Sequence, residues 1–318
     1  MKKITLALGG GGIKGFSHIG VIRQLEKEGY QVAAVAGTSV GGIVGALYAA
    51  GYTTEEMESF AKSLKFPNIF NRASDDQPSL IGLQGLFKLL EERLNGKRIE
   101  DLKIPFAAIA VDINSGRELV IDSGDVLRAT QATSAIPGVF PSVKLGHMNL
   151  VDGGILDPVP VSTARWLNSD HPIIAVSLSI PTDKWQDSSK MQIPSYVPIP
   201  EFIVHHLNQL RLGQAMQVFV DSTDIMTNMI ADLRLKMEKP DVLLRPEVFK
   251  YSLVDRVDVD EAIAFGEQAV VQARQEIQAA FKVFRRFDRW LKPSYMNGIL
   301  LSEISEISTS PDEGKNRQ

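Results

Sequence analysis

The chain has 318 residues, of which 44% are hydrophobic and 23% charged, with a formal net charge of −4 and no cysteine. This is the composition of a globular protein with enough apolar residues for an enzyme-sized core. The lack of cysteine excludes disulfides, thiolate catalysis and cysteine-bound metals, and it fits a reducing compartment. The acidic balance argues against a general affinity for nucleic acid.

Short apolar segments alternate with helical ones along the first 50 residues. Residues 3–8 predict a strand; the apolar run is too short for a signal peptide, so we expect a cytoplasmic protein. Residues 14–28 predict a helix closed by Gly29, and residues 32–36 and 40–50 predict a second strand and helix. The uncharged run from Val32 to Thr54 is interrupted by glycines, which favours this interpretation over a membrane span.

This alternation predicts an α/β fold with parallel strands and helices packed on the sheet. Thr53 to Glu56 predict the cap of a third helix. The further expected elements are strands over 105–111, 118–122 and 173–179, a helical segment over 80–94, and long helices over 201–236 and 258–292. The irregular stretches 66–100 and 181–200 are candidate lids or walls of an acyl groove.

Four consecutive glycines, Gly9 to Gly12, follow the first strand and lead through Lys14 and Gly15 into the first helix. The spacing matches a dinucleotide fingerprint, but the second strand lacks the acidic residue that binds the ribose. A phosphate-binding P-loop fails because Phe16 stands where lysine is required. The remaining functional interpretation is an oxyanion hole, whose backbone N–H groups converge at a helix start; a plain turn would need fewer glycines.

A GxSxG sequence, Gly37-Thr38-Ser39-Val40-Gly41, lies between the second strand and the second helix. A nucleophile elbow requires this strand-to-helix context, because the sharp turn exposes the serine hydroxyl at the helix start. Ser39 is therefore the candidate nucleophile, and it needs a base.

Two kinds of base are possible. A triad of Ser39, Asp152 and His171 or His205 has the chain order of an α/β-hydrolase, but such folds place several strands before the nucleophile. Alternatively, Asp152, followed by two glycines, takes the proton directly, best if burial raises its pKa. An Asp-Gly-Gly turn without chemistry is also common. His18 is interpreted as a packing or hydrogen-bonding residue.

The three motifs together resemble the patatin-like phospholipases, especially the compact bacterial members. The resemblance rests on Gly10 to Gly15, on Gly37 to Gly41 and on Asp152-Gly153-Gly154. Further matching stretches are Pro105 to Gly116, Ser134 to Pro141 and Pro158 to Pro160, so that the similarity covers roughly residues 4–280.

The resemblance implies a three-layer α/β/α fold with a central, mostly parallel sheet, forming one domain over residues 1–280. It implies that Ser39 attacks an ester carbonyl and that Asp152 is the general base, without histidine, metal or other cofactor. The implied supporting roles are an oxyanion hole at Gly10, Gly11 and Gly12, a loop supported by Lys14 and Gly15, and an elbow shaped by Gly37 and Gly41.

The implied substrates are acyl esters of phospholipids, lysophospholipids or related lipids. One departure is Gly9, where plant members carry aspartate; many bacterial members share the glycine. The alternative is a non-catalytic lipid-binding or regulatory protein on the same fold, since a fold does not fix a function. The intact motifs argue against it.

Aromatic and basic residues alternate at helical spacing between Phe281 and Lys292. Residues 281–301 are therefore expected to form an amphipathic helix, followed by a disordered tail over 302–318. The aromatic face of 281–292 either contacts a membrane surface, making the protein peripheral there, or docks on the domain or on a second subunit. The oligomeric state is not predicted.

Overall fold

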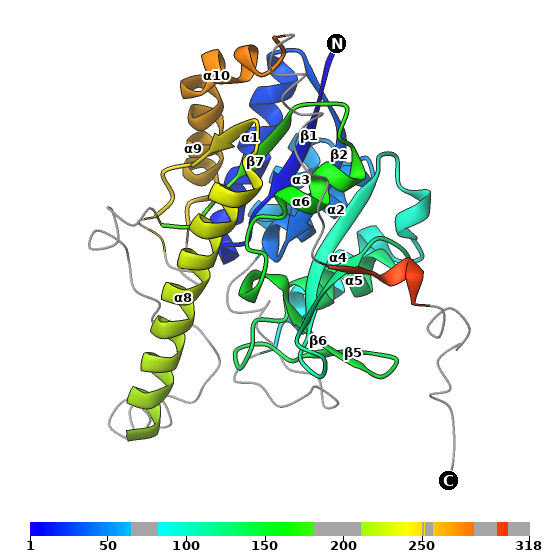
Figure 1. Ribbon diagram of the computed structural model, residues 1–318, viewed down its shortest axis with the longest axis vertical. Helices are drawn as coiled ribbons and strands as arrows, with labels where there is room; N and C mark the ends of the chain where they lie inside the picture. The colour runs from blue at the N-terminus through cyan, green and yellow to red at the C-terminus, as the bar shows by residue number, and fades with distance from the viewer. Residues whose placement is uncertain (65–81, 181–210, 250, 252–256, 283–297, 305–318) are drawn as a thin grey trace.

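A mixed β-sheet forms the centre of the computed structural model, which describes residues 1–64, 82–180, 211–249, 251, 257–282 and 298–304 (Figure 1). Its strands are β1 (Lys2–Leu8), β2 (Tyr30–Thr38), β3 (Phe106–Asp112), β4 (Arg117–Ile121), β5 (Val143–Leu145), β6 (Met148–Asp152), β7 (Ile173–Val176), β8 (Val242–Leu244) and β9 (Ile299–Leu300). The main path through the sheet runs β5-β6-β3-β2-β1-β7-β8, with β4 paired to β3 and β9 to β4. The strands from β3 to β8 on this path are parallel, whereas β4 and β6 run antiparallel to β3.

Helices cover both faces of this sheet, as Figure 1 shows. They are α1 (Phe16–Lys27), α2 (Val40–Ala49), α3 (Thr54–Ser63), α4 (Gln84–Leu94), α5 (Val126–Thr133), α6 (Val161–Leu167), α8 (Arg211–Glu238), α9 (Val259–Gln272) and α10 (Arg274–Ala279). Helices α1, α2 and α5 pack on one face, whereas α6 packs on the other face and contacts α8. The predicted three-layer α/β/α fold with a mostly parallel sheet is confirmed.

The central strands are buried on both sides because their side chains alternate between two cores. In β1, Leu6 and Leu8 enter the large core beneath α1 and α2, while Ala7 enters a smaller core with α6. In β7, Ile174 and Val176 belong to the large core and Ala175 to the smaller one. Continuous apolar runs are the expected sequence of such strands.

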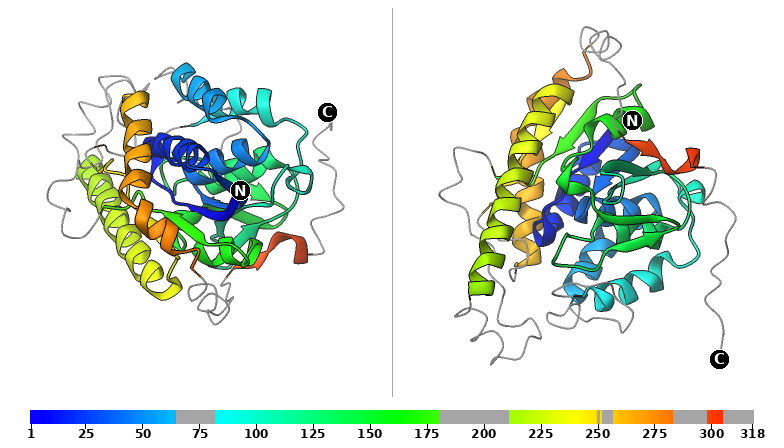
Figure 2. Two further views of the ribbon diagram at one scale, coloured as in Figure 1. Left: turned by 90° about the horizontal axis from the view of Figure 1, so that it is seen from above. Right: turned by 60° about the horizontal axis from the view of Figure 1, so that its bottom comes forward.

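Helix α1 is held by a very close contact with α9, which lies against it in Figure 2. A Cβ atom on Gly20 would lie 1.9 Å from the carbonyl oxygen of Ile263, and one on Gly266 would lie 1.9 Å from that of Ser17. Since such distances are impossible, only glycine fits at these two crossing points. The helix that follows the glycine loop is therefore fixed from outside by α9.

Several local predictions are confirmed. The first two strands and helices lie where the sequence places them, and Gly29 ends α1 at a φ of 83°. Thr53 caps α3, accepting from the Glu56 N–H, and the Glu56 side chain accepts from the Thr53 N–H, which is a full capping box. In the described part of the chain, no helix combines the length and the apolar character needed to cross a bilayer.

The C-terminal helical predictions need correction. The helix predicted over 258–292 breaks at Ala273 between α9 and α10, and α10 ends at Ala279; residues 283–292 lie outside the described residues. The helix predicted over 281–301 is also wrong at its end, where β9 pairs with β4 and Leu301–Glu303 form a 3-10 turn. β9 extends the sheet beyond β4, and this pairing satisfies backbone N–H and C=O groups that a helix would otherwise pair internally.

The first aromatic residue of the predicted amphipathic stripe docks on the domain. The Phe281 ring stacks on Tyr30 with 5.7 Å between the ring centroids, and the ammonium of Lys2 lies 5.1 Å from the Phe281 centroid. Residues 283–297, with the rest of the stripe, lie outside the described residues. The same holds for 305–318 of the predicted tail, for 66–81 and 181–200 of the candidate lids, and for 201–210 of the helix predicted over 201–236.

Candidate active site

Ser39 occupies a strained turn between β2 and α2. Its backbone has φ 55° and ψ −127°, and among the described residues only Lys239 is another non-glycine residue with positive φ. Such a conformation costs on the order of 1–3 kcal/mol and persists only where the surroundings impose it. The Ser39 N–H donates to the Thr133 hydroxyl at 2.9 Å, and that hydroxyl donates to the Ile109 carbonyl at 2.5 Å.

The glycines on either side of Ser39 stand where backbones approach too closely for any side chain. A Cβ atom on Gly37 would lie 2.4 Å from the carbonyl oxygen of Gly41. One on Gly41 would lie 2.2 Å from the carbonyl oxygen of Leu8, at the end of β1. These contacts press the elbow against the start of the glycine loop and thereby bring Ser39 to that loop.

Asp152 lies at the end of β6 and is within hydrogen-bonding reach of Ser39. Its carboxylate accepts a hydrogen bond from the Gly154 N–H at 2.7 Å, and the Ser39 hydroxyl lies close enough to lower its pKa. The close turn after it is possible because Gly153 has no Cβ, which would lie 2.5 Å from the Ile109 carbonyl oxygen. β6 pairs antiparallel with β3, and this pairing carries Asp152 to Ser39.

Burial changes the acidity of this carboxyl group. Desolvation raises the pKa of Asp152 to about 6, although the nearby Ser39 hydroxyl and the hydrogen bond from the Gly154 N–H act in the opposite direction. A carboxylate with a pKa near 6 is ionised at neutral pH and is a much better proton acceptor than an exposed aspartate. Asp152 therefore has both the position and the basicity for proton transfer from Ser39.

The glycine loop has two N–H groups committed to the fold, those of Gly9 and Gly10, and two glycines, Gly11 and Gly12, that line the site; the Gly9 N–H donates to the Val176 carbonyl at 2.9 Å. The Gly10 N–H donates to the Pro158 carbonyl at 3.0 Å, so it holds the loop and is not available to an oxyanion. Within the described part of the chain, no hydrogen bond engages the N–H of Gly11 or Gly12, and both residues line a pocket at Ser39. Gly12 has a φ of 58°, a conformation that favours glycine.

The residues after the loop fix its position against the elbow. A Cβ atom on Gly15 would lie 2.2 Å from Val40 Cγ2, so the glycine permits the approach of α2. The carbonyl of Lys14 accepts from the Ser17 hydroxyl at 2.8 Å, and the Lys14 side chain is buried, where its charge attracts the Asp224 carboxylate. Lys14 thus connects the loop to α8.

His18 forms a hydrogen bond with the glycine loop. Its ring Nε2 lies 2.8 Å from the Gly9 carbonyl oxygen and acts as the donor to it. Burial lowers the pKa of His18 to about 4, so the ring is neutral at physiological pH. Since Nε2 is committed to the loop, His18 is a hydrogen-bonding residue of the fold, as predicted. In the described part of the chain, neither pocket at Ser39 is lined by a histidine.

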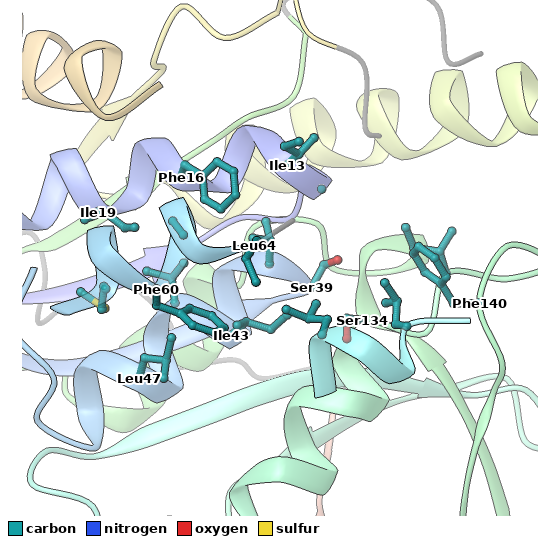
Figure 3. Close-up of a pocket in the computed structure, with 18 residues that line it drawn as sticks. Ile13, Phe16, Ile19, Ser39, Ile43, Leu47, Phe60, Leu64, Ser134 and Phe140 are labelled. Carbon is teal, nitrogen blue, oxygen red and sulfur yellow. The ribbon is translucent and has the colours of Figure 1, made fainter. Parts of the chain in front are cut away.

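Two pockets of different character meet at Ser39. The first is an apolar cavity of about 130 Å³ between α1, α2, α3 and α4 (Figure 3). Ile43 lies nearer to Ser39 in Figure 3, whereas Leu47 and Ile19 lie at the far end. Leu83 and Leu86, from the segment predicted to form an acyl-groove wall, also line the cavity.

The second pocket, of about 110 Å³, lies on the Asp152 side of Ser39 and is much more polar. It is bounded by the glycine loop and by α8, which contributes Thr223, Asp224, Thr227 and Asn228. Gly12, Ser39 and Ile136 line both pockets. An ester carbonyl at Ser39 would therefore have an apolar pocket on one side and a polar pocket on the other.

Sequence reasoning missed the residues that reach this site from distant parts of the chain. Thr133 supports the elbow, and Arg234 of α8 forms ion pairs with Glu118 at 2.8 Å and Asp157 at 3.0 Å. The Asp157 carbonyl in turn accepts from the Thr38 hydroxyl at 2.8 Å. The only signal near Thr133 was its position next to the stretch that begins at Ser134, which the resemblance already included.

Comparison with known proteins identifies a family model and several relatives that this chain resembles. The family model described as patatin-like phospholipase matches residues 6–165, which is half of the chain and includes both Ser39 and Asp152. An uncharacterized NTE family protein of Mycobacterium tuberculosis is 38% identical over 180 residues, covering 56% of this chain and 49% of that protein. Lysophospholipase NTE1 of Mycosarcoma maydis is 36% identical over 171 residues, covering 50% of this chain and 9% of that protein.

These alignments span at most about half the length of the relatives concerned. Among solved structures, VipD from Legionella pneumophila has a similar fold, with a TM-score of 0.53 at 11% sequence identity over 87% of this chain and 67% of the VipD chain. At that identity the similarity concerns the fold alone.

Proposed function

Because the chain belongs to the patatin-like phospholipase family, we propose that it is a lipid acyl hydrolase acting through Ser39 and Asp152. The substrates are carboxylic esters of phospholipids, lysophospholipids or related lipids. The observation that carries the proposal is the Ser39 hydroxyl lying beside the buried Asp152 carboxylate, next to an apolar cavity.

In the first half of the reaction, Asp152 accepts the hydroxyl proton of Ser39 while Oγ attacks the ester carbonyl carbon. The carbonyl oxygen becomes negative and is stabilised by the N–H groups of Gly11 and Gly12 at the start of the helical turn. The bond to the leaving oxygen then breaks, and that oxygen takes the proton from Asp152. The products are an acyl ester of Ser39 and a free alcohol.

In the second half, water attacks the acyl carbon and gives a proton to Asp152. The bond between the acyl carbon and Ser39 Oγ breaks, and Oγ recovers the proton. The fatty acid is released, and the site is as it was before the reaction. During both halves the acyl chain occupies the apolar cavity, whose burial of methylene groups contributes about 0.8 kcal/mol for each one fully removed from water.

Two features of the site support catalysis over the alternative of a non-catalytic lipid-binding protein. The backbone of Ser39 is strained, and such strain clusters at active sites and ligand-binding sites. The elevated pKa of Asp152 has a cost in stability, which a binding protein has no reason to keep.

The test is labelling with a fluorophosphonate probe, combined with hydrolysis of a lysophospholipid. We expect wild type to be labelled and active, Ser39→Ala to lose both, and Asp152→Asn to lose at least about 1000-fold in kcat, within the range for removing a dyad member. Ser59→Ala, which removes an exposed hydroxyl on α3, is the matched control. Labelling that persists in Ser39→Ala, or an unlabelled and inactive wild type, would overturn the proposal.

A further inference from the structure

The polar pocket beside Ser39 contains charges that the ester hydrolysis itself does not require. Apart from Asp152, its charged lining side chains in the described part of the chain are Lys14 and Asp224. Lys14 comes from the glycine loop and Asp224 from α8, so the pocket has a positive and a negative group on different walls.

The wall that carries Asp224 is firmly attached to the sheet. The Asn228 side chain accepts from the Ile180 N–H at 2.7 Å, just beyond β7, and donates to the Asp224 carbonyl at 2.7 Å. Further along α8, Arg234 is ion-paired with Asp157, which follows the Asp152 turn. The pocket is therefore formed by fixed elements, and the position of Asp224 relative to Ser39 is set by the fold.

The negative charge of the Asp224 carboxylate is only partly offset by the neighbouring Lys14. The carboxylate is half-buried, and no hydrogen bond engages it among the described residues. Burial raises the pKa of Asp224 to about 6 and the negative charge of Asp221 acts in the same direction, while Lys14 opposes both. One ammonium group is thus insufficient to offset desolvation, and a second cation in the pocket would be attracted to Asp224.

The apolar cavity lies on the opposite side of Ser39 and suits the acyl chain, which leaves the polar pocket for the alcohol part of the ester. We propose that this pocket receives the head group of the lipid and that Asp224 selects head groups bearing a cationic nitrogen. In a zwitterionic head group, the phosphate would face Lys14 and the nitrogen would face Asp224. This assignment of the polar pocket to the head group rests on the proposed function, because the reaction at Ser39 decides which part of the lipid enters each pocket.

The test compares two short-chain, monomeric lipids that share the acyl chain and the phosphate but carry a cationic or an uncharged group beyond it: hexanoyl lysophosphatidylcholine and hexanoyl lysophosphatidylglycerol. Their dissociation constants are measured calorimetrically at pH 7.5 on Ser39→Ala and on Ser39→Ala combined with Asp224→Asn. We expect the added substitution to weaken binding of the choline lipid about tenfold, as for one lost charge-assisted contact, and to leave the glycerol lipid unchanged or bound more tightly.

The matched control is Asp232→Asn in the Ser39→Ala background, which removes another α8 carboxylate, paired with Arg245 outside the pocket. It should change neither dissociation constant. An equal effect of Asp224→Asn on both lipids, or no binding of either lipid at millimolar concentration, would overturn the inference. Because binding is measured without turnover, an inactive wild type would count against the proposed hydrolysis but not against the head-group site.

Discussion

The N–H of Ser39 donates to the Thr133 hydroxyl, and the same hydroxyl donates to the carbonyl of Ile109 in β3. The strained Ser39 turn is thereby tied to the neighbouring strand through one side chain of α5. A single hydroxyl thereby joins two buried backbone groups at this turn.

Thr133→Val should therefore weaken both the fold and the reaction. The substitution keeps the shape but leaves the Ser39 N–H unpaired, so we expect the free energy of unfolding to fall by about 1–3 kcal/mol. A relaxed elbow should lower kcat about 10- to 100-fold. Urea unfolding and hydrolysis rates measure the two effects. Thr133→Ser, which keeps the hydroxyl, should recover most of each; if it is as defective as valine, the hydrogen bond is not the cause.

The pH dependence of hydrolysis should report Asp152. The base must be ionised to accept a proton, and its pKa is about 6, so kcat/KM should rise with pH and level off above about 7. Monohexanoylglycerol is a suitable substrate because it has no titrating group. Since burial also raises the pKa of Asp224 to about 6, the profile is repeated in Asp224→Asn. A midpoint that persists there belongs to Asp152, whereas a flat profile between pH 5 and 8 contradicts its role as base.

Asp152→Asn should stabilise the protein at neutral pH. The folded state raises the pKa of Asp152 from 3.8 to about 6, which corresponds to about 3 kcal/mol. Below pH 4 the group is protonated in both folded and unfolded chains and costs nothing. As pH rises through 6, the wild type must ionise a buried carboxyl and loses this stability. We expect the variant to be about 1–3 kcal/mol more stable at pH 8 by chemical denaturation, with the difference vanishing toward pH 4. A variant less stable than wild type at pH 8 would show that the buried carboxylate is favoured by its contacts.

Leu47→Trp should shorten the acyl chains that the enzyme accepts. Leu47 lies at the end of the apolar cavity far from Ser39, so a larger side chain there fills the space meant for the end of a long chain (Figure 3). We expect kcat/KM for palmitoyl esters to fall about tenfold, a factor equal to about 1.4 kcal/mol, with butyrate esters changed less than twofold. Equal losses on both esters would indicate general damage from overpacking, which costs about 1–3 kcal/mol in a filled core.

Local chemistry made part of this structure predictable from sequence. The Ser39 elbow and the cap at Thr53 depend on neighbouring residues, whose spacing is visible in the chain. The central strands were equally visible, since strands buried on both faces have continuous apolar runs. Even so, the antiparallel pairing of β6 with β3 was not predicted, although it delivers Asp152 to the site.

The rest of the structure depends on contacts between residues that are far apart in the sequence. The spacing of residues within a motif does not encode such contacts. Nothing near Thr133 or Arg234 reveals that the first supports the elbow and the second ties α8 to the Asp152 turn. The commitment of the Gly10 N–H to Pro158 has the same origin, because four consecutive glycines look alike until the partner strand is placed. The predicted helix over 258–292 failed because helical spacing of apolar residues continues through Ala273, where the chain changes direction.

The crossing of α1 and α9 at Gly20 and Gly266 sets a limit on how this fold can be divided. The stretch by which the family is recognised ends at residue 165, yet α9 comes from well beyond it and holds the helix that follows the glycine loop. A fragment ending at 165 would also expose the edge of β1 that pairs with β7. The smallest segment that could be exchanged between related proteins is therefore longer than residues 6–165. It must include both Gly20 and Gly266.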